Sequence, residues 1–108
     1  MVRKLPNIIP IPGRIKKARL ILGISKEKLG IAVGIKKLSA SSDINQYENR
    51  KCIPGFLILK KIAKTLSVPM AYFYAEDDML TKFLFLYGKI NKKSRKQLLE
   101  FCKNISIQ

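Results

Sequence analysis

The sequence predicts an all-α fold, and three features point to it. Apolar residues recur at helical spacing in successive segments, as Ile15, Ala18 and Leu22 do. Helix-ending glycines such as Gly23 and Gly34 follow these segments. Neither Asn-Gly nor Asp-Gly, the strongest short signals of a β-hairpin, occurs in the chain. The 108 residues suffice for one domain with a modest core.

The N-terminal part should contain an arm and two short helices. Residues 1–13 are expected to form an extended arm, because prolines interrupt any helix there. Residues 14–22 fit a helix that ends before Gly23. Residues 25–33 fit a second helix, and Ser25 is a good N-cap because its hydroxyl can accept from a free backbone N–H.

The rest of the chain continues in the same pattern after an irregular link at 35–40. Helical spacing predicts further segments at 41–48, 56–66, 70–74, 78–88 and 94–102. We therefore divide the chain into the arm at 1–13, a helical domain at 14–75 and a C-terminal helical extension at 76–108.

The charge of the chain indicates a polyanionic partner. There are 22 Lys and Arg against 7 Asp and Glu, with no His, which gives a net charge of +15. Nucleic acid is the commonest partner of so basic a domain. Residues 1–66 carry +12 and residues 67–108 carry +3, so the N-terminal part should face the partner. The alternative is that the chain is basic only because the proteins of its cytoplasm are generally rich in lysine, and the charge alone does not exclude this explanation.

Several classes of protein are disfavoured. No apolar run approaches the roughly 20 residues that cross a bilayer. The proline-rich opening is unlike a secretory signal, so a cytoplasmic location is expected. Cys52 and Cys102 without any His argue against a metal site, and we expect reduced thiols and no cofactor, with a disulfide left open. Without a nucleophile–base pair or a phosphate-cradling Gly loop, we expect no enzyme.

The stretch SASSDINQYENRK, residues 39–51, carries the strongest functional signal. On a helical wheel, Ala40, Ile44 and Tyr47 form the buried stripe. The opposite side carries amides and a hydroxyl: Ser42, Asn45, Gln46 and Asn49. These groups both donate and accept hydrogen bonds, as base edges in the major groove require. A plain solvated helix with a polar end would look the same, so the wheel alone leaves both interpretations open.

Glu48 lies beside the buried stripe in a chain poor in acids. A half-buried carboxylate needs a partner, and Arg19 on the inner edge of the first helix is the expected one. Such a bond would join the first helix to the third and leave Arg19 spare donors for a phosphate.

A family resemblance rests on the order of these motifs. The segments RIKKARLILGISKEKLGIAVGI, DINQYENRK and LILKKIAKTLSVPMAYF together resemble the lambda-repressor-like helix-turn-helix family of XRE or Cro type. The resemblance covers about residues 14–74. It implies a five-helix bundle with one or two additional C-terminal helices, a scaffold helix at 25–33 and a recognition helix at 41–48 in the major groove.

The resemblance also implies roles for individual residues. Base reading would fall to Ser41, Ser42, Asn45 and Gln46. Phosphate contacts would come from Ser25, Lys26, Asn49, Arg50 and Lys51. The bridge from Arg19 to Glu48 recurs in the family and agrees with the wheel.

The chain departs from the family pattern in several places. The link before Ile44 is about four residues longer than usual, which bears on the role of Ser41. Arg50 stands where the family has Gly, so we expect Asn49 to take the left-handed conformation instead. Asp43 would be repelled by phosphates, so we expect it to cap the helix or to pair locally.

The expected function is sequence-specific binding of double-stranded DNA by a transcriptional regulator, with repression favoured. A single recognition helix covers one half-site, so a homodimer is expected. The first dimer surface to consider is residues 78–108, which could instead fold back on the domain. A second candidate patch is formed by Leu20, Ile21, Leu57 and Ile58.

Other functions rank lower. The main alternative is a protein-interaction module, such as an antitoxin or adaptor that uses the same fold. RNA binding usually needs exposed aromatic residues, and most of the Phe and Tyr residues here sit at core spacing. Residues 78–108 are too few for a separate effector domain, so no small-molecule effector is expected.

Overall fold

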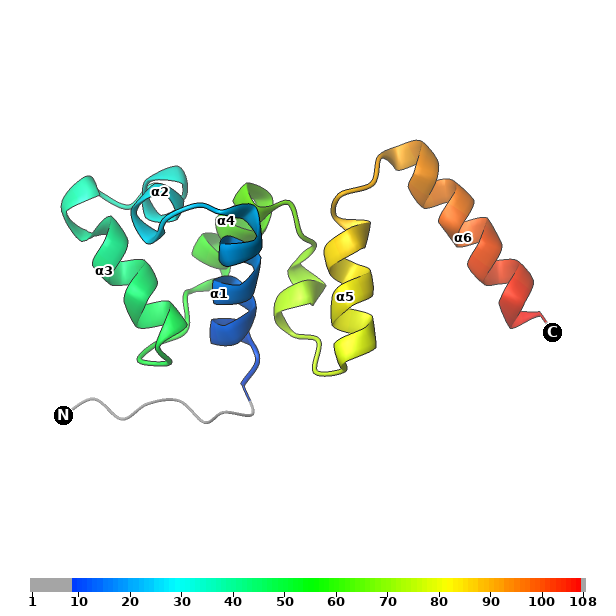
Figure 1. The fold of residues 1–108 in the computed structure, drawn as a ribbon, viewed down its shortest axis with the longest axis horizontal. Coiled ribbons are helices and arrows are strands. Elements are labelled where there is room, and N and C mark those ends of the chain that lie inside the picture. The colour runs from blue at the N-terminus through cyan, green and yellow to red at the C-terminus, as the bar shows by residue number, and fades with distance from the viewer. Residues whose placement is uncertain (1–8, 108) are drawn as a thin grey trace.

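The computed structural model describes residues 9–107, in which helices are joined by turns and loops and no strand occurs (Figure 1). The elements follow in the order α1 (Ile11–Leu22), α2 (Lys26–Ala32), α3 (Lys37–Glu48), α4 (Phe56–Leu66), the 3-10 helix η1 (Met70–Phe73), α5 (Asp78–Tyr87) and α6 (Lys92–Ser106). The predicted all-α fold is confirmed. None of the described helices is both long and apolar enough to cross a membrane.

One core joins the elements from α1 to η1. Each contributes at least one fully buried side chain: Ile15, Leu29, Ile44, Ile62 and Phe73. Burying such a side chain stabilises the fold by about 1.5–3 kcal/mol, so the shared core holds these helices together. From α1 to η1 most of the apolar spacing that predicted the helices also packs them, but Leu22 is an exception, because it is exposed at the end of α1.

The first helix begins at Ile11, so the predicted arm at 1–13 was too long at its C-terminal end. Pro12 lies in the first turn, where backbone N–H groups have no intrahelical acceptor, so the N–H that proline lacks is not needed there. Its fixed φ also suits a helix. Ile11 and Pro12 are both buried, and that packing favours the early start. Residues 1–8, the rest of the predicted arm, lie outside the described residues.

The third helix begins at Lys37, four residues before the predicted start. The expected irregular link is thus largely an additional N-terminal turn of α3. Serine is only a modest helix former, so local propensity gives this turn little support. Here Ser39 and Ser42 donate through their hydroxyls to the carbonyls of Lys36 and Ser39. Ala40 packs against α2, so tertiary contact outweighs the weak local propensity.

The C-terminal end of α5 is attached to the end of α4. Gly88 passes so close to Ser67 that an added Cβ would lie 2.2 Å from the Ser67 carbonyl oxygen. Lys89 Nζ donates to the carbonyls of Leu66 (2.9 Å) and Ser67 (2.8 Å), which end α4. The ammonium also lies 4.1 Å from the centroid of the Phe85 ring. These contacts hold α5 on the helical domain.

The last helix, α6, departs from the rest of the molecule (Figure 1). None of its residues is buried. The alternative that residues 78–108 fold back on the domain therefore holds for α5 and not for α6. The helix is longer than the predicted 94–102 because Asn91 caps it, its side chain accepting from the backbone N–H of Ser94 at 2.8 Å.

Both cysteines are free: Cys52 is half-buried and Cys102 is exposed on α6. Within residues 9–107, no three His, Cys, Asp or Glu side chains gather as metal ligands would.

Candidate nucleic-acid interface

Helices α2 and α3 form a closely packed helix-turn-helix pair. A Cβ added at Gly30 would lie 2.7 Å from both the Cβ and the carbonyl oxygen of Ala40, so α2 and α3 cross at a distance that glycine permits. Gly34, with φ of +92°, makes the turn between them. Ser25 caps α2 by accepting from the Lys28 N–H at 3.0 Å, and its own hydroxyl proton can still be donated.

A buried ion pair fixes the C-terminal end of α3. Arg19 Nε donates to Glu48 Oε2 at 2.6 Å, and Nη2 donates to Oε1 at 3.0 Å. The two side chains are only 8% and 1% exposed. A third donor, Nη1, reaches the Ile24 carbonyl at 3.0 Å. The structure contains the predicted contact, but Arg19 is too buried to offer spare donors to a phosphate.

The outward face of α3 carries the residues predicted to read bases. Ser41, Ser42 and Gln46 are exposed, and Asn45 is half-buried. Because α3 starts at Lys37, the two serines lie in the second turn and not at the helix start. Sequence reasoning missed Leu38, which occupies the first turn and is 102% exposed, because its segment was assigned to a link.

Asn45 is engaged by its neighbours. Lys26 Nζ donates to Asn45 Oδ1 at 2.6 Å, and Asn49 Nδ2 donates to the same oxygen at 2.9 Å. The structure thus brings a predicted base reader together with two predicted phosphate-binding residues. The bond from Lys26 also ties the start of α2 to the middle of α3.

The end of α3 corrects one expectation. Arg50 has a φ of +64°, whereas Asn49 has a φ of −95°, so the left-handed residue is Arg50 and not Asn49. The Lys51 N–H donates to the Gln46 carbonyl at 3.0 Å and the Arg50 N–H to the Tyr47 carbonyl at 3.4 Å. This pair of bonds is a Schellman motif, which requires the left-handed residue just after the C-cap. The hydrogen-bond geometry outweighs the strain of roughly 1–2 kcal/mol.

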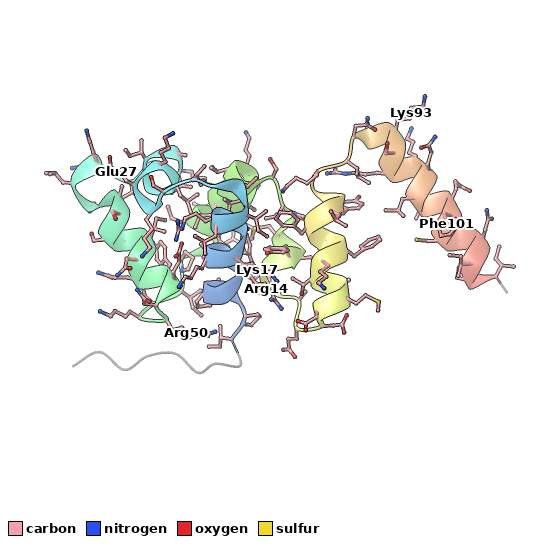
Figure 2. The ribbon with its side chains drawn as sticks, in the orientation of Figure 1. Arg14, Lys17, Glu27, Arg50, Lys93 and Phe101 are labelled. Carbon is pink, nitrogen blue, oxygen red and sulfur yellow. The ribbon has the colours of Figure 1, made fainter. Side chains whose placement is uncertain are left out.

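Arg50 also contacts the start of the described chain. Its Nη1 donates to the Ile9 carbonyl at 2.7 Å, and Figure 2 shows Arg50 at the end of α3 near the beginning of α1. Lys51, next in the chain, is exposed. Of the predicted phosphate-binding residues, Lys51 therefore lies at the surface, while Arg50 uses part of its guanidinium group to bind the protein's own backbone.

Asp43 does not cap the helix, so the first of its two expected roles was wrong, and local pairing stays a prediction. It is the seventh residue of α3, because the helix starts earlier than predicted. Its half-buried carboxylate lies one turn before Tyr47. The pKa of Tyr47 is raised, first by burial and then by the nearby Cys52 and Asp43.

Comparison with known proteins agrees with this geometry. No protein-family profile matches the chain. HTH-type transcriptional regulators of Sinorhizobium medicae (strain WSM419) and Rhizobium meliloti (strain 1021) are each 36% identical over 76 residues, which are 68% of this chain and 52% of each relative. The chain spans about half the length of these curated relatives. The crystal structure of the transcriptional regulator BswR matches with a TM-score of 0.79 and 33% identity, over 87% of this chain and 93% of that chain.

The helix-turn-helix pair, its open polar face and these similarities lead to one assignment. The chain belongs to the HTH-type transcriptional regulators.

Proposed function

We propose that this protein is a regulator of XRE or Cro type that reads double-stranded DNA with α3 in the major groove, as a repressor. The observation that supports it best is that α3 is held at two places while its polar face stays open. Ala40 packs on α2, and Glu48 is tied to α1. A helix about 10–12 Å across fits a groove about 12 Å wide.

The exposed side chains of α3 suit base recognition. Gln46 can pair with adenine through two hydrogen bonds, and such a pair discriminates by about 1–3 kcal/mol. Ser41 and Ser42 can donate or accept. On binding DNA, Lys26 would give up its hydrogen bond to Asn45 and donate to a phosphate oxygen instead, because an ammonium group binds a charged oxygen more strongly than an amide oxygen. Asn45 would then be able to read a base.

Phosphate contacts would flank this face. Lys26 and Ser25 come from the start of α2, and Asn49 and Lys51 follow the readers at the end of α3. In this role Arg50 would keep its bond to Ile9 and add positive charge beside the DNA backbone. Such contacts orient the protein without reading sequence.

We further propose a homodimer that forms through α5 and α6. Large apolar side chains are exposed on both helices: Met79, Leu80, Phe83, Leu86, Leu99, Phe101 and Ile105. A single helix the length of α6 is marginal in water unless it packs, and exposed apolar patches mark interfaces. The groove between α5 and α6, with a volume of about 440 Å³, is lined by Phe83, Tyr87 and Leu98 among others and could take such side chains. The second candidate patch is less continuous, because Ile58 is half-buried.

The test is selection of bound sites from random duplex DNA, followed by titration with salt. A specific dimeric reader should enrich a motif with two half-sites about one helical turn apart. A steep salt dependence without any enriched motif would contradict base reading. Binding to no duplex at moderate salt would favour the alternative of a protein-interaction module, for which the exposed face of α6 is the supporting observation.

Two substitutions separate reading from positioning. Gln46→Ala should relax the preference at one base position, whereas Lys51→Ala should weaken binding to all sequences alike. If both substitutions lower all affinities equally, Gln46 is not a reader.

A further inference from the structure

The first turn of α3 presents one apolar side chain on an otherwise polar and basic surface. Leu38 is the second residue of the helix and is 102% exposed, so nothing in residues 9–107 covers it. It precedes Ser42 by four residues and Asn45 by seven, and this spacing places all three on one side of a helix. Leu38 therefore heads the row of proposed base readers.

The early start of α3 gives Leu38 this position. Leu38 lies three residues before Ser41, which places it roughly 4.5 Å further along the helix axis. In helix-turn-helix proteins the N-terminal residues of the recognition helix contact the base edges. If α3 enters the major groove as proposed, Leu38 is among the first side chains to meet a base pair.

We propose that Leu38 recognises the 5-methyl group of a thymine in the major groove. The proposal rests on the proposed function and adds a reader that hydrogen bonding cannot supply. Leucine has no donor or acceptor, and the thymine methyl is the apolar group that base pairs display in this groove. Contact between the two would remove both from water.

The surroundings of Leu38 favour DNA over a protein partner. Lys36 and Lys37 are exposed beside it, and they would attract phosphates on the same strand or its neighbour. Leu38 is the only exposed apolar residue of α3. Protein interfaces need contiguous apolar surface, which α5 and α6 offer and α3 does not.

The test couples a change in the protein to a change in the DNA. The full chain and its Leu38→Ala variant are titrated by fluorescence anisotropy against the selected duplex. Each thymine is then replaced in turn by uracil, which lacks the methyl group but keeps the same hydrogen bonds. For the unchanged protein, one thymine per half-site should be sensitive, with about a fourfold loss of affinity on replacement. In the Leu38→Ala variant that sensitivity should vanish, so that the thymine and uracil duplexes bind alike.

A matched control separates this contact from general loss of apolar surface. Phe56→Ala removes an exposed apolar side chain at the start of α4, outside the proposed reading face and outside both candidate dimer surfaces, and should leave the uracil pattern unchanged. Both variants should unfold at nearly the same temperature as the unchanged protein, because neither side chain is buried.

Three outcomes overturn the inference. They are a uracil pattern identical in Leu38→Ala and the unchanged protein, a selected half-site without thymine, and no sensitivity to uracil at any position. In each of these cases specific DNA binding, and so the proposed function, survives. Failure to bind any duplex would instead remove the proposed function and this inference with it.

Discussion

Replacing Gly30 with alanine is expected to force α2 and α3 apart. The added Cβ would lie 2.7 Å from the Ala40 Cβ, 2.7 Å from its carbonyl oxygen and 2.8 Å from its Cα. Carbon atoms pack at about 3.5–4.0 Å, so relief needs a shift of roughly 1 Å. The atoms in the way belong to the backbone or to a rigid Cβ, so no side-chain rotation can relieve the contact and a helix must move.

The change in stability caused by Gly30→Ala is the sum of two opposing effects. Overpacking of this kind destabilises by about 1–3 kcal/mol. Alanine in a helix interior returns up to about 1 kcal/mol relative to glycine. Because Ala40 is fully buried and its backbone is held inside α3, we place the overpacking at the upper end of that range. The net loss should be about 1–2 kcal/mol, and each kcal/mol lowers the unfolding temperature by about 4–8 °C.

The assay is thermal unfolding followed by circular dichroism, with Gly13→Ala as the matched control. Gly13 also lies in a helix, α1, but a Cβ there would meet nothing within 4 Å. Gly13→Ala should therefore leave stability unchanged or raise it. If Gly30→Ala raised stability as much as Gly13→Ala, the contact with Ala40 would not be rigid and the reasoning would fail. The folded Gly30→Ala protein should also lose specific DNA affinity, because the shift displaces the reading face.

Three further predictions concern stability. Arg19→Met should lower the free energy of unfolding, measured by urea titration, by about 3–5 kcal/mol, because it leaves the buried carboxylate of Glu48 without a cation. The double variant Arg19→Met/Glu48→Leu should recover most of that loss. If the effects of the two single substitutions simply add, the two side chains are not coupled and the prediction is wrong. Burial raises the pKa of Tyr72, with Arg14 opposing, so the folded state holds this proton more tightly than the unfolded state does. Stability should then be insensitive to this group below pH 10.0 and fall above it, and Tyr72→Phe should reduce that alkaline loss in unfolding measured against pH; an unchanged slope would refute it. Lys89→Met should lower stability by about 1 kcal/mol in thermal unfolding, because two carbonyls at the end of α4 lose their donor, and an unchanged unfolding temperature would show that water replaces it.

Local patterns in the sequence predicted most of the fold and part of the site. Apolar spacing identified the helices, and from α1 to η1 the reason is that burying an amphipathic face stabilises a short helix. The wheel of residues 41–48 placed Ile44 inside and Gln46 outside, as the structure does. The scarcity of acids singled out Glu48, because a lone carboxylate at the core boundary needs a cation within reach.

Contacts between distant segments decided what local patterns could not. The start of α3 is favoured by the contact between Ala40 and Gly30, which the pattern of a single segment does not reveal. The left-handed residue is Arg50 because two hydrogen bonds to the last turn of α3 require that position.

The sequence by itself determined which faces are apolar, which are polar and how strongly basic the chain is, since these depend on residue identity and spacing alone. Tertiary structure decided where α3 begins, that Leu38 stands at its exposed tip, and that α5 packs on the domain while α6 does not. The reason is physical: a helix end or a docked helix depends on small differences between local preference and long-range packing, and the packing term exists only once the chain has folded.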